Sequence, residues 1–77
     1  MDMMTLGKQI AYYRKEWGLT QEALANRLGV TNQAVSKWER GAALPDVETI
    51  LVLSRLFCVS MEALLLNDLT GLEDIEL

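Results

Sequence analysis

The 77-residue sequence contains no histidine and a single cysteine. Histidine is the usual general base and the commonest metal ligand of proteins, so its absence removes the usual candidate for both roles. Cys58 has no second cysteine with which to form a disulfide or a zinc cluster, and its place in the apolar run Leu56-Phe57-Cys58-Val59 predicts a buried side chain. The sequence also lacks a nucleophile–base pair and a phosphate-binding glycine loop. We therefore expect no enzymatic activity, no cofactor and no bound metal.

Long apolar runs are also missing. None approaches the ~18 residues that a membrane-spanning helix needs, and Met1-Asp2-Met3-Met4 has no basic segment of a secretory signal. Proline occurs once and glycine five times, while 51% of residues are apolar, so collagen-like, low-complexity and disordered chains are excluded. The length suffices for one domain with a small core. The sequence predicts a soluble, cytoplasmic domain with no membrane partner.

Basic residues are outnumbered by acidic ones, and the net charge of −4 at first argues against a nucleic-acid partner. The two signs are unevenly distributed, however. Residues 5–41 hold six basic and three acidic side chains, whereas residues 42–77 hold one basic and seven acidic side chains. A mildly basic half is thus joined to an acidic half. This asymmetry leaves open a nucleic-acid partner for the first half and a protein partner for the second.

Helix signals dominate the sequence, and no strand-like alternation of apolar and polar residues appears. An apolar stripe predicts a first helix from about residue 5 to the glycine at 18. It comprises Leu6, Ile10, Tyr13 and Trp17. Further helices are predicted over residues 21–28, 32–40, 47–57 and 61–66. We expect an all-α fold, a compact bundle of five short helices.

Three connectors between these helices share one chemical pattern. They are Gly18-Leu19-Thr20, Gly29-Val30-Thr31 and Cys58-Val59-Ser60. Glycine can end a helix in the left-handed conformation, and the next residue can turn toward the core. The hydroxyl residue can then cap the following helix, a contribution of ~1 kcal/mol.

The acidic tail, residues 67–77, has two interpretations. Thr70 and Glu73 have capping-box spacing, which predicts a last short helix whose apolar residues contribute to a dimer contact. Alternatively, the tail begins a linker in a longer protein. We therefore divide the chain into a domain over residues 1–66 and a tail over residues 67–77.

The helix predicted over residues 32–40 has two chemically different faces. On a helical wheel at ~100° per residue, amide, hydroxyl and cationic side chains gather on one face. They are Asn32, Gln33, Ser36, Lys37 and Arg40. The opposite face carries Ala34, Val35 and Trp38, and the only acid, Glu39, lies at the boundary. With a small Ala25 in the preceding helix and Gly29 at the turn, this order and spacing indicates a helix-turn-helix.

From Leu6 to about Leu66 the chain resembles the phage-repressor and Cro-like helix-turn-helix family, also called the XRE family. The resemblance is dense and is carried by Gly7, Ile10, Arg14, Gly18-Leu19-Thr20-Gln21-Glu22, Leu24-Ala25, Gly29-Val30-Thr31, Val35-Ser36, Trp38-Glu39, Gly41, Pro45, Leu51, Leu56, Val59-Ser60 and Leu64-Leu65. It implies a lambda-repressor-like fold in which the second helix of the helix-turn-helix lies in the major groove of double-stranded DNA.

The resemblance also implies roles for individual residues. The base-reading positions match Asn32, Gln33, Ser36 and Lys37, and an amide can pair bidentately with adenine. The phosphate-binding positions match Arg14, Gln21, Thr31, Arg40 and Gly41. In addition, Arg14 and Glu39 match a pair that joins the first helix to the recognition helix in the family. Lys37 fits either a guanine or a phosphate.

The function that the resemblance implies is sequence-specific transcriptional regulation, by a repressor that binds a pseudo-palindromic operator as a homodimer. The few basic residues predict modest affinity per protomer, which favours a dimer on two half-sites. Apolar residues of the helix over 47–57 are candidates for that contact as well as for the core. Two alternatives stay open: the antitoxin of a toxin–antitoxin pair, and a protein-interaction module that has kept this fold.

Overall fold

The computed structural model describes residues 3–65, which form five α-helices and no strand. They are α1 (Met3–Glu16), α2 (Gln21–Leu28), α3 (Asn32–Glu39), α4 (Val47–Phe57) and α5 (Met61–Leu65). The predicted all-α fold is confirmed, although α1 begins two residues earlier than expected. Leu66 and the tail over residues 67–77 lie outside the described residues. Within the described part of the chain, no helix is long and apolar enough to cross a membrane.

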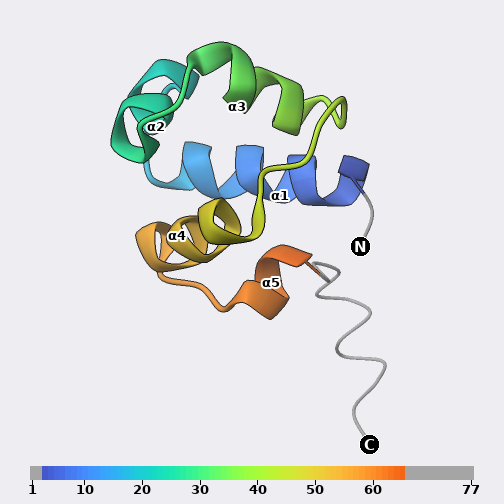
Figure 1. Cartoon of the computed structure of the whole chain (residues 1–77). Coiled ribbons are helices and arrows are strands. Elements are labelled where there is room, and N and C mark those ends of the chain that lie inside the picture. Colours follow the sequence, from blue (N-terminus) through green and yellow to red (C-terminus); the bar gives the residue numbers. More distant parts are fainter. Residues whose placement is uncertain (1–2, 66–77) are drawn as a thin grey trace, which may run out of the picture.

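The helices are arranged around α1. In Figure 1, α2 and α3 lie on one side of α1, and α4 and α5 lie on the other. Contacts join α1 to α3, α4 and α5, while α2 packs on α3 and α4 packs on α5. The first helix is therefore the common support of two helix pairs, one of which is the predicted helix-turn-helix.

Helices α2 to α5 each follow a side chain that caps their first turn. Thr20 accepts a hydrogen bond from the N–H of Ala23 at 2.9 Å, and Thr31 accepts one from Ala34 at 3.1 Å. Asp46 accepts a hydrogen bond from the N–H of Thr49 at 2.8 Å, and Ser60 accepts one from the N–H of Ala63 at 3.0 Å. Each cap satisfies an N–H group that the helix itself leaves without a partner. These four helix starts therefore depend on single residues next to them in the sequence.

The ends of the helices confirm the left-handed conformation predicted for Gly18 and Gly29. They also correct the prediction that the side chain of Cys58 is buried. Gly18 and Gly29 have φ of 70° and 74°, the left-handed conformation expected of them. Cys58 occupies the corresponding position after α4 with φ of 60°, and it is exposed. The chain leaves α4 at this residue, so Val59 rather than Cys58 turns toward the core. An apolar run in the sequence does not reveal this change of direction.

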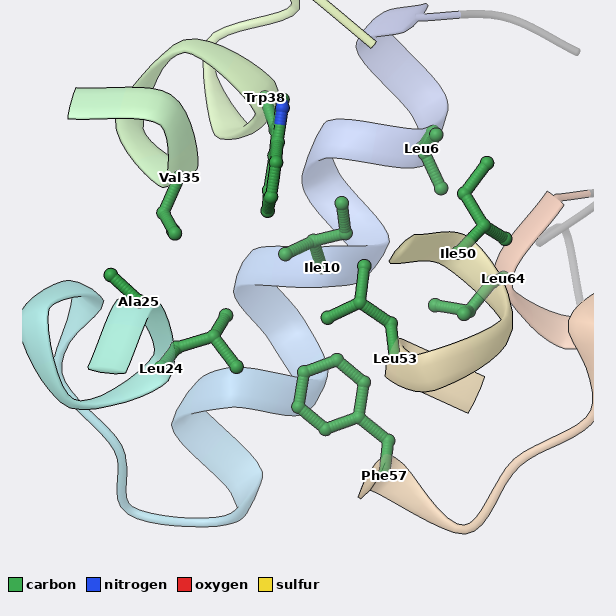
Figure 2. Close-up of a cluster of buried hydrophobic side chains, with 10 residues drawn as sticks. All are labelled: Leu6, Ile10, Leu24, Ala25, Val35, Trp38, Ile50, Leu53, Phe57 and Leu64. Atoms are coloured by element: carbon green, nitrogen blue, oxygen red, sulfur yellow. The ribbon is translucent and has the colours of Figure 1, made fainter. Parts of the chain in front are cut away.

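The core is formed by one or more side chains from every helix, as Figure 2 shows. Ile10 of α1 lies near its centre, between Val35 and Trp38 on one side and Leu53 and Phe57 on the other. The remaining buried apolar residues are Leu6, Leu24, Ala25, Ile50 and Leu64. Burial of each large side chain contributes roughly 1.5–3 kcal/mol, so this cluster supplies most of the stabilisation of a chain this short.

The sequence predicted that Trp17 continues the apolar stripe of α1, and this prediction is wrong. The helix ends at Glu16, and the indole of Trp17 remains 53% exposed. Its Nε1–H donates a hydrogen bond to the carbonyl oxygen of Phe57 at 3.3 Å. Tyr13, one turn earlier, stacks on the ring of Phe57 with centroids 5.7 Å apart. Trp17 thus links the end of α1 to the end of α4 from the surface.

Candidate nucleic-acid interface

The two faces of α3 are separated as the sequence predicts. Val35 and Trp38 are buried against the core. On the opposite side, Asn32, Gln33, Lys37 and Arg40 are exposed and Ser36 is half-buried. Nε of Arg40 donates a hydrogen bond to Oγ of Ser36 at 3.3 Å. The outward face therefore presents two amides, a hydroxyl and two cations, with no carboxylate among them.

The N-termini of α2 and α3 add positive potential to this side of the domain. An α-helix leaves its first N–H groups without intrahelical partners, and its dipole favours an anion near them. Thr20 and Thr31 each satisfy one such group, as described above. The hydroxyl of Thr31 is exposed and retains its own proton for donation. These termini can therefore receive phosphate oxygens beside the side chains of α3.

A single carboxylate, that of Glu39, joins three helices. Its Oε2 accepts a hydrogen bond from Nε of Arg14 at 2.6 Å, and its Oε1 accepts one from Nη2 of Arg14 at 3.0 Å. The same Oε1 accepts a hydrogen bond from Nε2 of Gln21 at 2.9 Å. The side chains of Arg14 and Glu39 are only 12% and 8% exposed. Hydrogen bonding to the Glu39 carboxylate raises the pKa of Arg14 against the opposing effect of burial. The guanidinium is therefore a charged structural link between α1 and α3.

These hydrogen bonds limit what two of the predicted phosphate contacts can do. Arg14 also donates from Nη1 to the carbonyl oxygen of Leu19 at 2.9 Å, so all three of its nitrogens are bonded within the protein. Gln21 has one amide proton committed to Glu39. A phosphate beside α2 would therefore meet the backbone N–H and the second amide proton of Gln21 more readily than Arg14.

The end of α3 is closed by Gly41 with φ of 75°. The N–H of Gly41 donates to the carbonyl oxygen of Trp38 at 3.1 Å, and the N–H of Ala42 donates to that of Lys37 at 2.8 Å. The backbone of Gly41 is thus engaged in the helix end. Of Arg40 and Gly41, both expected at phosphates, Arg40 is the exposed one, and it has no ion-pair partner among residues 3–65.

A close approach of α1 to α3, which the sequence reasoning missed, also positions α3. A Cβ atom placed on Gly7 would lie 2.2 Å from the carbonyl oxygen of Trp38 and 3.0 Å from that of Glu39. Only glycine permits the backbones to come this near. The bond between Gln21 and Glu39 was also missed, because no local spacing relates residues in two different helices.

A profile of the helix-turn-helix family matches residues 10–64 of the chain. The chain belongs to this family. Repressor protein C2 of Salmonella phage P22 is 37% identical over 91% of this chain and 32% of its own length. The transcriptional regulator ImmR of Bacillus subtilis is 40% identical over 84% of this chain and 51% of its own length. The chain therefore spans about a third of the first relative and about half of the second.

The helix-turn-helix domain also resembles a solved structure, the P22 c2 repressor in complex with a synthetic operator. The TM-score is 0.76 at 38% identity, and the match covers 82% of this chain and 96% of the other. The predicted membership of the phage-repressor type, and the repressor-like fold, are thereby confirmed. Among residues 3–65, no cluster of three or more cysteine, aspartate or glutamate side chains could hold a metal ion.

Proposed function

We propose that this domain binds double-stranded DNA sequence-specifically and regulates transcription, as a repressor that acts by occupying its operator in the cytoplasm. The observation that carries the proposal is the outward face of α3, which is exposed, free of carboxylates and fixed to the rest of the domain through Trp38 and Glu39. Support comes from the P22 c2 repressor, whose structure in complex with an operator has the same fold.

In this proposal the N-terminal half of α3 enters the major groove. Asn32 and Gln33 are exposed in its first turn, and their amides suit the N6 and N7 edge of adenine. Ser36 and Lys37 follow one turn later and reach neighbouring bases or a phosphate. Thr31, Arg40 and the N-terminus of α2 at Gln21 contact the sugar–phosphate backbone, which fixes the register without reading sequence.

The balance of charge sets how strongly one domain can bind. Phosphate contacts supply much of the affinity of DNA-binding proteins, and here Arg14 is already committed to Glu39. A single domain therefore binds weakly with a shallow dependence on salt. We infer that two domains act together on half-sites about one helical turn, or ~10 base pairs, apart.

The proposal is tested by selecting bound duplexes from a random pool at moderate salt and sequencing them. An enriched pseudo-palindrome is the expected result, and a single unpaired motif would retain DNA binding but contradict the paired half-sites. If no sequence is enriched, DNA binding itself is contradicted, and the interaction-module alternative gains.

Gln33→Ala then tests the base-reading role. The variant removes the exposed amide without touching the core, so affinity for the selected duplex should fall by ~1–3 kcal/mol while affinity for scrambled duplex is unchanged. Asn26→Ala, which removes an exposed amide from α2, serves as the matched control. Equal weakening of Gln33→Ala on both duplexes would assign Gln33 to the backbone instead.

A further inference from the structure

Two hydrogen bonds tie Arg40, the residue that follows α3, to Ser36 one turn earlier. The backbone N–H of Arg40 donates to the carbonyl oxygen of Ser36 at 3.0 Å, which closes the helix. From the side chain of the same residue, Nε–H donates to Oγ of Ser36 at 3.3 Å. The second bond joins a residue expected at a phosphate to a residue expected at a base edge.

This side-chain bond affects what the Ser36 hydroxyl can offer to a DNA base. A serine hydroxyl has one proton to donate and two lone pairs that accept. Its oxygen accepts from Arg40, whereas its proton has no acceptor among residues 3–65. A hydroxyl that accepts a hydrogen bond from a cation is polarised, which strengthens it as a donor. Ser36 therefore faces DNA mainly as a donor.

The rest of the Arg40 guanidinium remains available to the DNA backbone. The side chain is exposed, and its two Nη groups make no hydrogen bond within the described residues 3–65. A guanidinium carries five N–H donors in one plane, so a bond from Nε orients this plane and leaves the Nη donors for a phosphate. A phosphate contact by itself carries no sequence information. Through Ser36, however, Arg40 is connected to a base-reading position.

We propose that Arg40 is a positioning residue that determines specificity: its Nε holds the Ser36 hydroxyl as a donor toward a base with acceptors in the major groove, guanine foremost. In that groove guanine presents two acceptors, N7 and O6, whereas cytosine presents only its N4 amino donor. The inference rests on the proposed function, because it states which base the outward face of α3 reads at one position.

The duplex selected from the random pool, with each base pair changed in turn, locates the position that Ser36 reads. Fluorescence anisotropy with the full chain measures the dissociation constant of each duplex at one salt concentration. Ser36→Ala removes the hydroxyl, so at one position of the half-site the preference for guanine over cytosine should fall from about tenfold to within about threefold. Every other position should keep its preference.

Arg40→Lys then separates the orientation of the hydroxyl from phosphate binding. Lysine keeps the positive charge but has a methylene group at the place of Nε, so the bond to Ser36 is lost while a phosphate contact remains. We expect the same position, and no other, to lose its preference for guanine, with the salt dependence of binding unchanged. Arg27→Lys, the same change at an exposed arginine in the last turn of α2, is the matched control.

A measurement without DNA tests the hydrogen bond itself. In the free protein, the Nε–H proton of Arg40 should exchange with water about threefold more slowly than that of Arg27, because only the first is hydrogen-bonded to a side chain. Ser36→Ala should abolish this difference. NMR measures both exchange rates in one sample, and equal rates in the unaltered protein would overturn the proposal.

The proposal is also overturned if Arg40→Lys keeps the preference that Ser36→Ala loses, since Arg40 would then bind phosphate alone. A Ser36→Ala variant that changes no position, or a position that prefers cytosine, contradicts it as well. These outcomes leave the proposed function standing, because a motif has still been selected. If the unaltered chain selects no motif, the proposed function fails, and this inference fails with it.

Discussion

Helices α3 and α4 each bury one face against the core, yet they are held in place by different kinds of contact. Directional contacts hold α3: the carbonyl oxygens of Trp38 and Glu39 lie against Gly7, and the Glu39 carboxylate bonds to Arg14 and Gln21. Apolar burial of Ile50, Leu53 and Phe57 holds α4, along with its own cap at Asp46. The outer faces differ in the same sense, polar on α3 and apolar on α4.

This difference fits the role proposed for α3. Apolar burial is non-directional, so it tolerates small shifts of a helix along its contact surface. Side chains that read bases must be held to within ~0.5 Å of the productive geometry. A close backbone approach and a hydrogen-bonded ion pair fix the position and rotation of α3, whereas α4 needs only to cover the core.

The largest effect is expected when the close approach of α1 to α3 is prevented. Gly7→Ala places a methyl group against two backbone oxygens that cannot rotate away, so the helices must separate. We expect a loss of ~2–3 kcal/mol in the free energy of unfolding after the helix propensity gain of ~1 kcal/mol is included. Denaturation in urea measures this loss. Affinity for the selected duplex should also fall under conditions in which the variant is folded.

Gly18→Ala provides the matched comparison, because it adds the same methyl group where no atom lies within 4 Å. Its expected loss is only ~1–2 kcal/mol, from the left-handed φ alone, and its DNA affinity should be unchanged. If Gly7→Ala proves no more harmful than Gly18→Ala and binds DNA normally, the tight contact does not position α3.

A smaller effect is expected from the ion pair. Glu39→Gln keeps the size of the side chain but leaves the mostly buried guanidinium of Arg14 without its counter-ion. Removing one partner of a buried pair is destabilising because the other charge stays desolvated, and we expect ~2 kcal/mol at this nearly buried site. Chemical denaturation checks the value, with Glu16→Gln at the exposed end of α1 as control. Comparable losses in the two variants would mean that the pair contributes no more than a surface charge.

Much of the fold could be predicted from the sequence, because helix starts and stops are local. Thr20, Thr31, Asp46 and Ser60 cap helices where the sequence places them, and the polar and apolar faces of α3 follow from periodicity alone. The pairing of Arg14 with Glu39 was implied by the family resemblance. Local patterns carry no information on which atoms of distant helices meet.

The features that the sequence did not predict are all contacts between residues of different helices. Gly7 has no local signal for its approach to Trp38, and Gln21 none for its bond to Glu39. The errors at Trp17 and Cys58 have a related cause. Both residues fit an apolar pattern, but each lies where the chain has just left a helix, so the periodicity no longer states where the side chain points.

The smallest effect concerns how α4 begins, and it depends on pH. Hydrogen bonds from Thr49 lower the pKa of the exposed Asp46 carboxyl below its ordinary value in the folded protein. A lowered folded-state pKa stabilises the fold above the unfolded-state pKa, and this stabilisation is lost as the pH falls through the folded value. Asp46→Asn retains a capping oxygen but does not titrate. The difference in urea midpoint between the two proteins should therefore be constant near neutral pH and shrink below about pH 4.

Every other carboxyl group is common to both proteins, so its titration cancels in this difference to first order. A gap that stays constant down to pH ~2 would show that the charge of Asp46 does not help α4 to form.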